Sequence, residues 1–296
     1  MEQITSPGEV RAVLNSADFL VPPVPDAGPP PGIAWLRASV SRFSNGPDHL
    51  RRRALGTGAL AKVVPATLHR DAFEQTTAVL SEAGEQPIDL IARVARPVPV
   101  LVLARALGIE TDAATVAEVA HAYHPHVEAT AAADLAVSDL VAACGGTADE
   151  TTAARICLLV QACDATTGLV GNALAAELTG YPDLGVNALL DRTLRAEPPI
   201  LSTRRVARTR TRVAGTEIPA GTVVRLDLTQ GENPDGDDLA FGAGPRSCPG
   251  RDHALAIATG ILEATRGCHL ADPDRPIAYE QAANLRVPAA LIVKTR

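Results

Sequence analysis

The spacing of apolar residues along the chain predicts mostly helices. Segment 151–178 gives the strongest helical pattern, a long apolar run that begins after a capping sequence at 147–150. Pro-containing sequences at 97–99 and 123–125 interrupt two of the weaker helical zones. The remaining segments with helical patterns are 7–18, 47–82, 88–107, 113–143, 187–196 and 250–266.

Other segments favour strands and loops. Residues 205–228 alternate between apolar and polar and contain the turn sequence Pro-Ala-Gly, which predicts short strands with a hairpin. Residues 21–32 are too rich in proline and glycine for a helix or central strand, so we expect a loop. Ser6 is the predicted cap of the first helix, with Pro7 at its first position. The pattern predicts a mainly α fold with small β elements.

Composition narrows the class of protein. The chain has 296 residues, 46% hydrophobic and 21% charged, with a formal net charge of -7, which is typical of a globular protein and argues against disorder or nucleic-acid binding. Nothing resembles a linker, so we predict one domain over 1–296. The longest apolar stretch, 97–109, falls short of the roughly 20 residues that cross a bilayer. Without a secretory signal, and with five scattered cysteines, we expect no membrane association and a cytoplasmic location.

The segment 241–250, with sequence FGAGPRSCPG, carries the most specific chemistry. Its glycines let backbone N–H groups approach a sulfur atom closely. Cys248 directly precedes a predicted helix, whose positive N-terminal end favours a thiolate. A thiolate in this setting can ligate iron. For the loop alone, a buried structural cysteine in a tight turn is the alternative.

This decapeptide resembles the haem-ligand loop of the cytochrome P-450 family. The resemblance implies a haem b cofactor, with Cys248 as the axial ligand of the iron and Arg246 paired with a haem propionate. The positions that match the family are Phe241, Gly242, Gly244, Arg246, Cys248 and Gly250.

Two further segments match the family in the same order along the chain. His49 and Arg53 match an H-x-x-x-R helix whose two basic residues, one turn apart, contact haem propionates. Arg205 matches the strand position that supplies another propionate-binding arginine. Taken alone, the arginine-rich helix is also compatible with a solvated face. The arginines at 208, 210 and 212 are expected to be solvated, although such a face also suits an acidic electron-transfer protein.

The predicted helix over 151–178 resembles the family's central helix, which covers the distal face of the haem. Ala162 keeps the position that leaves room for dioxygen, and Thr166 keeps that of the proton-relaying threonine. The acid expected before this threonine is replaced by alanine, and Asp164 lies one residue early. One residue is about 100° of helix rotation, so Asp164 reaches the same space only through a local bulge. The predicted catalytic residues are Thr166 and Asp164.

A second departure concerns the family's Glu-x-x-Arg signature. Arg195 fits, but the glutamate is missing, and neither Asp191 nor Glu197 has the right spacing to replace it. The loop at 231–238, which in the family carries a third member of this network, is short. We interpret the joint loss as a rebuilt support for the cysteine loop.

The chain is shorter than usual family members. The comparison places the missing material at the N-terminus, in the lid between 110 and 150, and in the loop before the cysteine. A shortened lid predicts a more open pocket that admits a bulky or carrier-bound substrate, or that a second subunit closes in a homo-oligomer. The loop 21–32 then forms a wall of the pocket, or is an inert spacer.

The resemblance implies monooxygenation of a small organic molecule, as in specialised metabolism, with dioxygen activated by two electrons from a ferredoxin-type partner. The altered central helix leaves open a haem enzyme that uses peroxide or catalyses a rearrangement or dehydration. The lost Glu-x-x-Arg leaves open a non-catalytic scaffold that activates another protein. The histidines of 121–126 are interpreted as a surface or pocket-rim cluster, with a metal site as the alternative.

Overall fold

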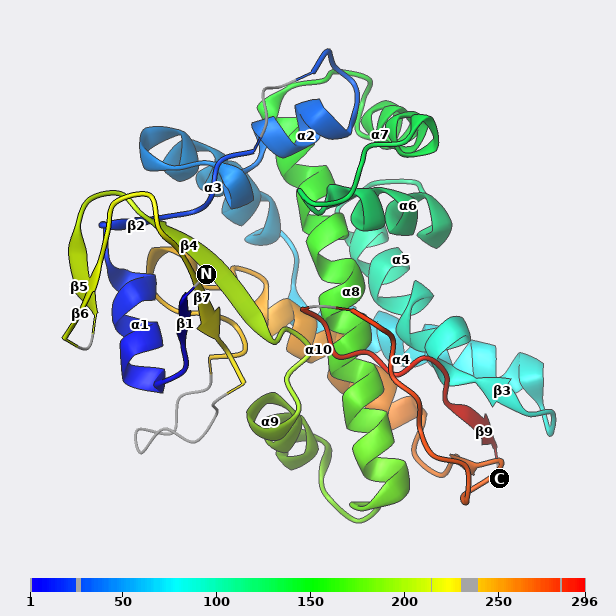
Figure 1. The fold of residues 1–296 in the computed structure, drawn as a ribbon. Helices are drawn as coiled ribbons and strands as arrows, with labels where there is room; N and C mark the ends of the chain where they lie inside the picture. Colours follow the sequence, from blue (N-terminus) through cyan, green and yellow to red (C-terminus); the bar gives the residue numbers. More distant parts are fainter. Residues whose placement is uncertain (1, 25–27, 214, 230–238, 283, 296) are drawn as a thin grey trace.

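The computed structural model describes residues 2–24, 28–213, 215–229, 239–282 and 284–295. Helices make up most of the molecule, as the sequence pattern predicts (Figure 1). A π-helical turn, η2 (Ile91–Ala95), and the 3-10 turns η1 (Ser41–Phe43) and η3 (Gly244–Arg246) lie between them. The α-helices are α1 (Pro7–Asn15), α2 (Ile33–Ser39), α3 (Gly46–Leu60), α4 (Pro65–Ala83), α5 (Pro97–Ala106), α6 (Ala113–Tyr123), α7 (Ala131–Ala143), α8 (Glu150–Thr179), α9 (Val186–Ala196) and α10 (Arg251–Ala264).

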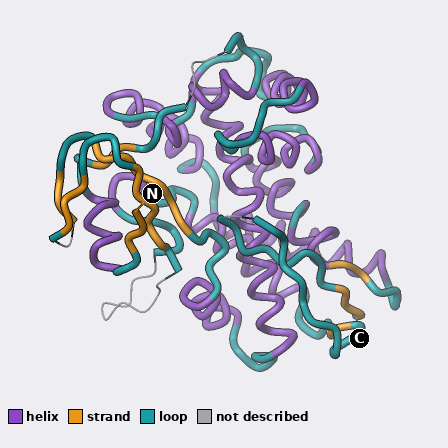
Figure 2. The backbone as a smooth tube through the Cα atoms, viewed as in Figure 1, coloured by secondary structure: helices purple, strands orange, loops and turns teal. Residues whose placement is uncertain are grey.

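Short strands form small sheets beside the helices, mostly on the side of the N-terminus (Figure 2). One sheet has the order β1-β7-β4-β2, with β1 parallel to β7 and the other pairs antiparallel. A second has the order β3-β9-β8, and β5 and β6 form a hairpin. The strands are β1 (Glu2–Ile4), β2 (Phe19–Leu20), β3 (Ile88–Asp89), β4 (Ser202–Ala207), β5 (Thr211–Val213), β6 (Thr216–Ile218), β7 (Val223–Asp227), β8 (His269–Leu270) and β9 (Ile292–Lys294).

Helix α8 runs through the middle of the molecule, and α3, α5, α6, α9 and α10 all pack against it (Figure 1). The predicted helix over 151–178 is therefore confirmed. Its cap is Asp149, whose carboxylate accepts a hydrogen bond of 2.8 Å from the backbone N–H of Thr152. This helix has the length and hydropathy of a membrane span, but 67% of its most apolar window is buried inside the protein. Packing against neighbouring helices accounts for its apolar character.

The C-terminal segment 284–288 lies directly on α8. A Cβ atom at Gly168 would stand 2.7 Å from the Cβ of Pro199 and 2.9 Å from the carbonyl oxygen of Arg286, so only glycine fits this contact. The Arg286 N–H donates to the Pro199 carbonyl at 2.9 Å, and the Leu201 N–H donates to the Asn284 carbonyl at 3.1 Å. Because β4 begins directly after Leu201, these contacts fix the position of the strand that carries Arg205.

Most segment boundaries follow the predictions. Zone 47–82 contains α3 and α4, and zone 113–143 divides into α6 and α7 at the Tyr-His-Pro sequence. Residues 205–228 contain the end of β4, which begins at Ser202, and all of β5 to β7. The described parts of 21–32 form a loop, which Asn45 holds through two side-chain hydrogen bonds to the backbone of Val21, at 3.0 and 3.1 Å. The shortened loop at 231–238 lies outside the described residues.

Several details differ from the predictions. The sequence pattern does not predict β1, which pairs with β7 more than 200 residues later. Ser6 precedes α1 but makes no side-chain cap hydrogen bond. Pro97 begins α5 rather than interrupting a helix, because the first turn needs no backbone donor there. The chain enters through the π turn η2, closed by a hydrogen bond of 3.0 Å from the Arg96 N–H to the Ile91 carbonyl.

Candidate functional site

The loop before α10 holds Cys248 in a tightly folded backbone. The Cys248 N–H donates to the carbonyl of Phe241 at 2.8 Å, which closes the loop. Gly242 and Gly244 have φ values of 67° and 68°, a left-handed conformation that favours glycine. A Cβ atom at Gly244 would also lie 2.7 Å from Oδ1 of Asn15, so the loop is seated against α1. These constraints explain why glycine occupies positions 242 and 244 of the cysteine loop.

Cys248 is an exposed cysteine at the start of α10. Desolvation by the surrounding protein raises the pKa of its thiol, whereas a backbone hydrogen bond from Gly250 and the charge of Arg53 lower it. By contrast, Cys157 and Cys163 are buried, and burial raises the pKa of Cys163 to about 12. Because a coordinated metal ion deprotonates a thiol outright, the accessible Cys248 is the cysteine suited to ligate one.

Four basic side chains from three parts of the fold gather beside this loop. His49 and Arg53 come from α3, Arg205 from β4 and Arg246 from η3, and we call them the basic cluster. The pKa of His49 is lowered to about 4, first by burial and then by the charges of Arg246, Arg53 and Arg205. The pKa of Arg205 is lowered to about 10, first by burial and then by Arg246 and Arg42. The side chains that the sequence predicts to bind propionates therefore lie close together.

The hydrogen bonds of the basic cluster go to neutral oxygen atoms. Arg53 Nη2 donates to the Ser247 carbonyl at 2.7 Å, and Arg246 Nη2 donates to Oδ1 of Asn45 at 3.0 Å. Arg205 Nη1 donates to Oγ1 of Thr203 at 3.1 Å. Within the described chain, none of the three arginines forms an ion pair, although His49 and Arg205 are only 6% and 7% exposed.

Buried cations without a counter-charge are costly, and this cluster repels itself. Two carboxylates placed between the arginines and the histidine would remove that cost. The two propionates of a haem supply such a pair, and Cys248 stands beside the same cluster through the bond between Arg53 and Ser247. The residues present therefore fit a haem with a thiolate ligand.

Helix α8 separates the predicted catalytic residues onto different faces. Ala162 and Thr166 are four residues apart and share one face, whereas Asp164 is rotated by about 200° from each. The helix is continuous from 150 to 179, without a bulge that would bring Asp164 round. Asp164 instead acts on His124, whose pKa is lowered by burial and by Arg42 and is raised by the charge of Asp164. Asp164 therefore does not lie in the position of the expected acid.

The hydroxyls of the Thr-Thr pair are used differently. Thr167 donates to the carbonyls of Cys163 at 2.8 Å and Ala95 at 3.1 Å, so its hydroxyl is committed to the fold. Thr166 is 3% exposed, and its hydroxyl makes no hydrogen bond to another described residue. Thr166 is thus the member of the pair that has a hydroxyl free for a bound molecule.

An ion-pair network stands near the missing Glu-x-x-Arg signature. Glu197 accepts from Arg192 at 3.4 Å and from Arg286 at 3.0 Å, and we call these three residues the Glu197 network. The two guanidinium groups also lie 4.0 Å from the ring centroids of Tyr181 and Tyr279. The predicted signature residue, Arg195, is exposed and forms no ion pair among the described residues.

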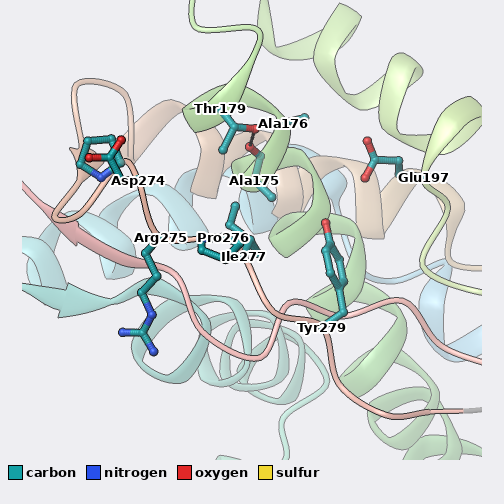
Figure 3. Close-up of a pocket in the computed structure, with 10 residues that line it drawn as sticks. Ala175, Ala176, Thr179, Glu197, Asp274, Arg275, Pro276, Ile277 and Tyr279 are labelled. Carbon is teal, nitrogen blue, oxygen red and sulfur yellow. Dashed lines mark hydrogen bonds between the residues drawn. The ribbon is translucent and has the colours of Figure 1, made fainter.

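Glu197 also connects backbone segments. Asn172 on α8 donates to the carbonyl oxygens of Glu197 at 2.9 Å and Arg286 at 3.1 Å. Figure 3 shows Glu197 and Tyr279 beside a cavity of about 320 Å3. The lining of this cavity does not include Cys248 or Thr166, so it is separate from the cysteine site. The sequence did not reveal this network because Arg286 is 89 residues from Glu197.

The histidines at 121–126 lie at the end of α6 and in the loop that follows. Arg37 of α2, 8% exposed, holds this turn by donating to the carbonyls of Ala122, Tyr123, His124 and Val127. In the described part of the chain, no group of three or more metal-ligating side chains is suited to hold a metal ion. No sequence pattern indicates this role of Arg37, because its hydrogen-bond acceptors are backbone carbonyl groups, which every residue has.

Comparison with solved structures identifies the fold. No family model and no curated relative matches the sequence, but solved structures do. A cytochrome P-450 in complex with an acyl carrier protein ligated to hexadec-9Z-enoic acid aligns over 99% of this chain and 92% of its own, with 21% identity and a TM-score of 0.82. A P-450 for C–S bond formation in chuangxinmycin biosynthesis aligns over 98% and 87%, with 19% identity and a TM-score of 0.78.

A third similar structure is a P-450 from Bacillus megaterium in complex with testosterone, with 16% identity, coverage of 99% and 93%, and a TM-score of 0.73. These matches show that the chain has the cytochrome P-450 fold, mainly α with small sheets. At these identities the likeness shows the fold alone, and the predicted shortening stays a prediction.

Proposed function

We propose that the chain is a haem-thiolate enzyme of the P-450 type that oxidises a small organic molecule by monooxygenation. One observation carries this proposal: an accessible cysteine at a helix start stands beside buried basic residues that have no carboxylate partner among the described residues. A haem b would supply both the iron that the thiolate binds and the two carboxylates that the basic cluster lacks. When bound, it supplies the chemistry that activates dioxygen.

In this proposal each residue of the site has a structural task. Cys248 would hold the iron, and the folded loop with Phe241, Gly242 and Gly250 keeps its sulfur accessible. The basic cluster would hold the two propionates through charge-assisted hydrogen bonds. The small side chain of Ala162 leaves space on the face that it shares with Thr166.

Thr166 is the proposed proton-handling residue on α8. Its free hydroxyl can donate to and accept from a bound molecule or water, whereas Asp164 lies on another face. With electrons supplied by a surrogate ferredoxin and its reductase, we expect Thr166→Ala to raise the peroxide released per electron several-fold. Asp164→Asn should change this ratio little. An equal rise in peroxide release in both variants would instead support the predicted role of Asp164 in proton relay.

The absorption spectrum of the reduced protein under carbon monoxide tests the haem-thiolate assignment. We expect a strongly red-shifted Soret band that Cys248→Ser abolishes. Cys268→Ser is the matched control, since Cys268 is also a free cysteine and lies on the other side of α10 in the sequence. A protein that retains no haem, even when haem is added during expression, would reject the enzyme assignment and favour a scaffold that activates a partner protein.

A second candidate, peroxide-driven oxidation, is favoured by the position of Asp164. Without an acid beside Thr166, protons reach the site from solvent less readily. Hydrogen peroxide already carries its protons, so oxidation by peroxide does not depend on that delivery. Turnover with hydrogen peroxide and no reductant would support this candidate, and strict dependence on an electron donor would reject it. The acyl carrier protein bound to one similar structure supports testing both free and carrier-bound substrates here.

A further inference from the structure

Arg42 is a cation at the edge of the site to which the proposed function gives no task. It lies in η1, is exposed, and stands close enough to Arg205 to lower the pKa of that buried guanidinium. Its guanidinium carbon is 5.8 Å from the ring centroid of Phe43 and 5.9 Å from that of Tyr123. The two rings are themselves 5.1 Å apart, so Arg42 rests on an aromatic platform.

The hydrogen-bonding edge of Arg42 is open. Nη1 donates to Oε1 of Gln161 on α8 at 3.2 Å, and among the described residues Nε and Nη2 have no acceptor. The free Nε and Nη2 donors form the side of a guanidinium that binds two oxygen atoms in parallel. Arg42 also forms no ion pair with a described acid.

The surroundings hold Arg42 in place before any ligand binds. Arg246 donates to the carbonyl of Ser41 at 3.4 Å, which ties η1 to the cysteine loop. On the other side, Arg37 fixes the turn that carries Tyr123, and the Tyr123 hydroxyl contacts Sγ of Cys157 at 3.2 Å. A preorganised guanidinium loses little conformational freedom when it binds a ligand.

We propose that Arg42 anchors an anionic group of the substrate, a carboxylate or a phosphate, through its free Nε and Nη2 donors. Arg42 donates to Gln161 on α8, and its charge lowers the pKa of Arg205, so the anchor lies beside the basic cluster. This inference rests on the proposed function, because it specifies the substrate class of that site. It predicts an amphipathic substrate with an apolar body over α8 and an anionic end at η1.

Calorimetric titration of the haem-loaded protein with decanoate, decyl phosphate and decanol tests the anchor. These probes share one apolar chain and differ in the end group. The variants are Arg42→Gln, which removes the charge, and Arg42→Lys, which keeps a charge but not the paired donors. Arg210→Gln is the matched control, because Arg210 is an exposed arginine whose partner is Glu217 on the distant hairpin. Thermal melts confirm that the variants fold.

We expect an anionic probe to bind the wild type more tightly than decanol, and Arg42→Gln to weaken that binding roughly 10- to 100-fold. Decanol binding and the Arg210→Gln variant should be unchanged, and Arg42→Lys should be intermediate. The preferred anion identifies the group as carboxylate or phosphate. No preference for an anion in the wild type, or a preference that survives Arg42→Gln, would overturn the proposal.

The same titrations separate this inference from the proposed function. Absence of the red-shifted Soret band from the wild-type protein would reject the haem-thiolate assignment alone. Calorimetry needs no spectral signal, so an anion preference that depends on Arg42 would still support the anchor in that case, and its absence would still reject it.

Discussion

Two arginine clusters in this protein solve the same electrostatic problem in opposite ways. In the Glu197 network, one carboxylate of the chain neutralises two guanidinium groups, and both stack on tyrosine rings. In the basic cluster, three arginines and a histidine face one another, and within the described chain no carboxylate joins them. Arginines that a carboxylate of the chain neutralises support the fold, whereas the buried Arg205 and the half-buried Arg53 and Arg246, which no described carboxylate neutralises, indicate an anionic ligand.

The largest expected effect is on ligand binding at the basic cluster. Arg205→Gln removes a buried charge that two bound carboxylates would need, so we expect haem affinity to fall roughly 100-fold. The haem-free protein should be no less stable than the wild type, because repulsion from Arg246 and Arg42 is relieved. Haem titration and thermal melts of both forms give the two quantities. A loss of stability with unchanged haem affinity would make Arg205 a structural residue.

The contact that the Glu197 network supports should be intolerant of added volume. Gly168→Ala places a Cβ atom against Pro199 and the Arg286 carbonyl, and we expect a loss of about 2 kcal/mol in the free energy of unfolding. Gly58→Ala on α3 is the matched control, because nothing lies within 4 Å of its added Cβ and alanine favours helix. Denaturant unfolding measures both. Equal stability of the two variants would contradict the tight packing on α8.

Removing the central charge of the Glu197 network should have a smaller effect. Its side chains are 25–38% exposed, so solvent screens the ion pairs and we expect Glu197→Gln to cost about 1 kcal/mol of stability. The more exposed pair of Glu217 and Arg210 is the comparison, and Glu217→Gln should cost less. Haem affinity should not change in either variant. A strong loss of haem with Glu197→Gln would show that this network supports the cysteine loop.

The haem-free protein should also lose stability at low pH. The pKa of His49 is about 4 in the folded chain and near 6.5 when unfolded. Between these values the unfolded state binds more protons, so stability should fall as the pH drops from 6.5 to 4. Bound propionates favour the protonated histidine and should flatten this slope, as should His49→Gln. Unfolding curves at several pH values provide the test, and identical slopes in all three proteins would refute it.

The sequence predicted the helical part of the fold well because its signals are local. The run 151–178 carries its apolar pattern and its capping residues within itself, and α8 follows it closely. Strands β1, β2 and β3 have two or three residues each and exist through partners far away in the chain, so no local pattern indicates them. The same holds for the C-terminal segment on α8, which is fixed by hydrogen bonds to residues 199–201.

The candidate site was predictable to the extent that motifs encode it. The cysteine loop, the His49 and Arg53 pair and Arg205 were identified from residue types at fixed spacings, and the structure brings them together. Helix geometry also showed in advance that Asp164 is displaced, but not that its charge opposes the lowering of the pKa of His124. Glu197 and Arg42 escaped prediction because their partners are distant in sequence or are aromatic faces.

Titration of the haem-free protein with haem and with haem dimethyl ester tests the central claim most directly, namely that unsatisfied arginines mark a site for two carboxylates. The ester keeps the ring and the iron but removes both negative charges. We predict that the wild type binds haem at least roughly 100-fold more tightly than the ester, and that Arg205→Gln narrows this ratio. Equal affinity of the wild type for haem and for the ester would show that the basic cluster is not a site for two carboxylates.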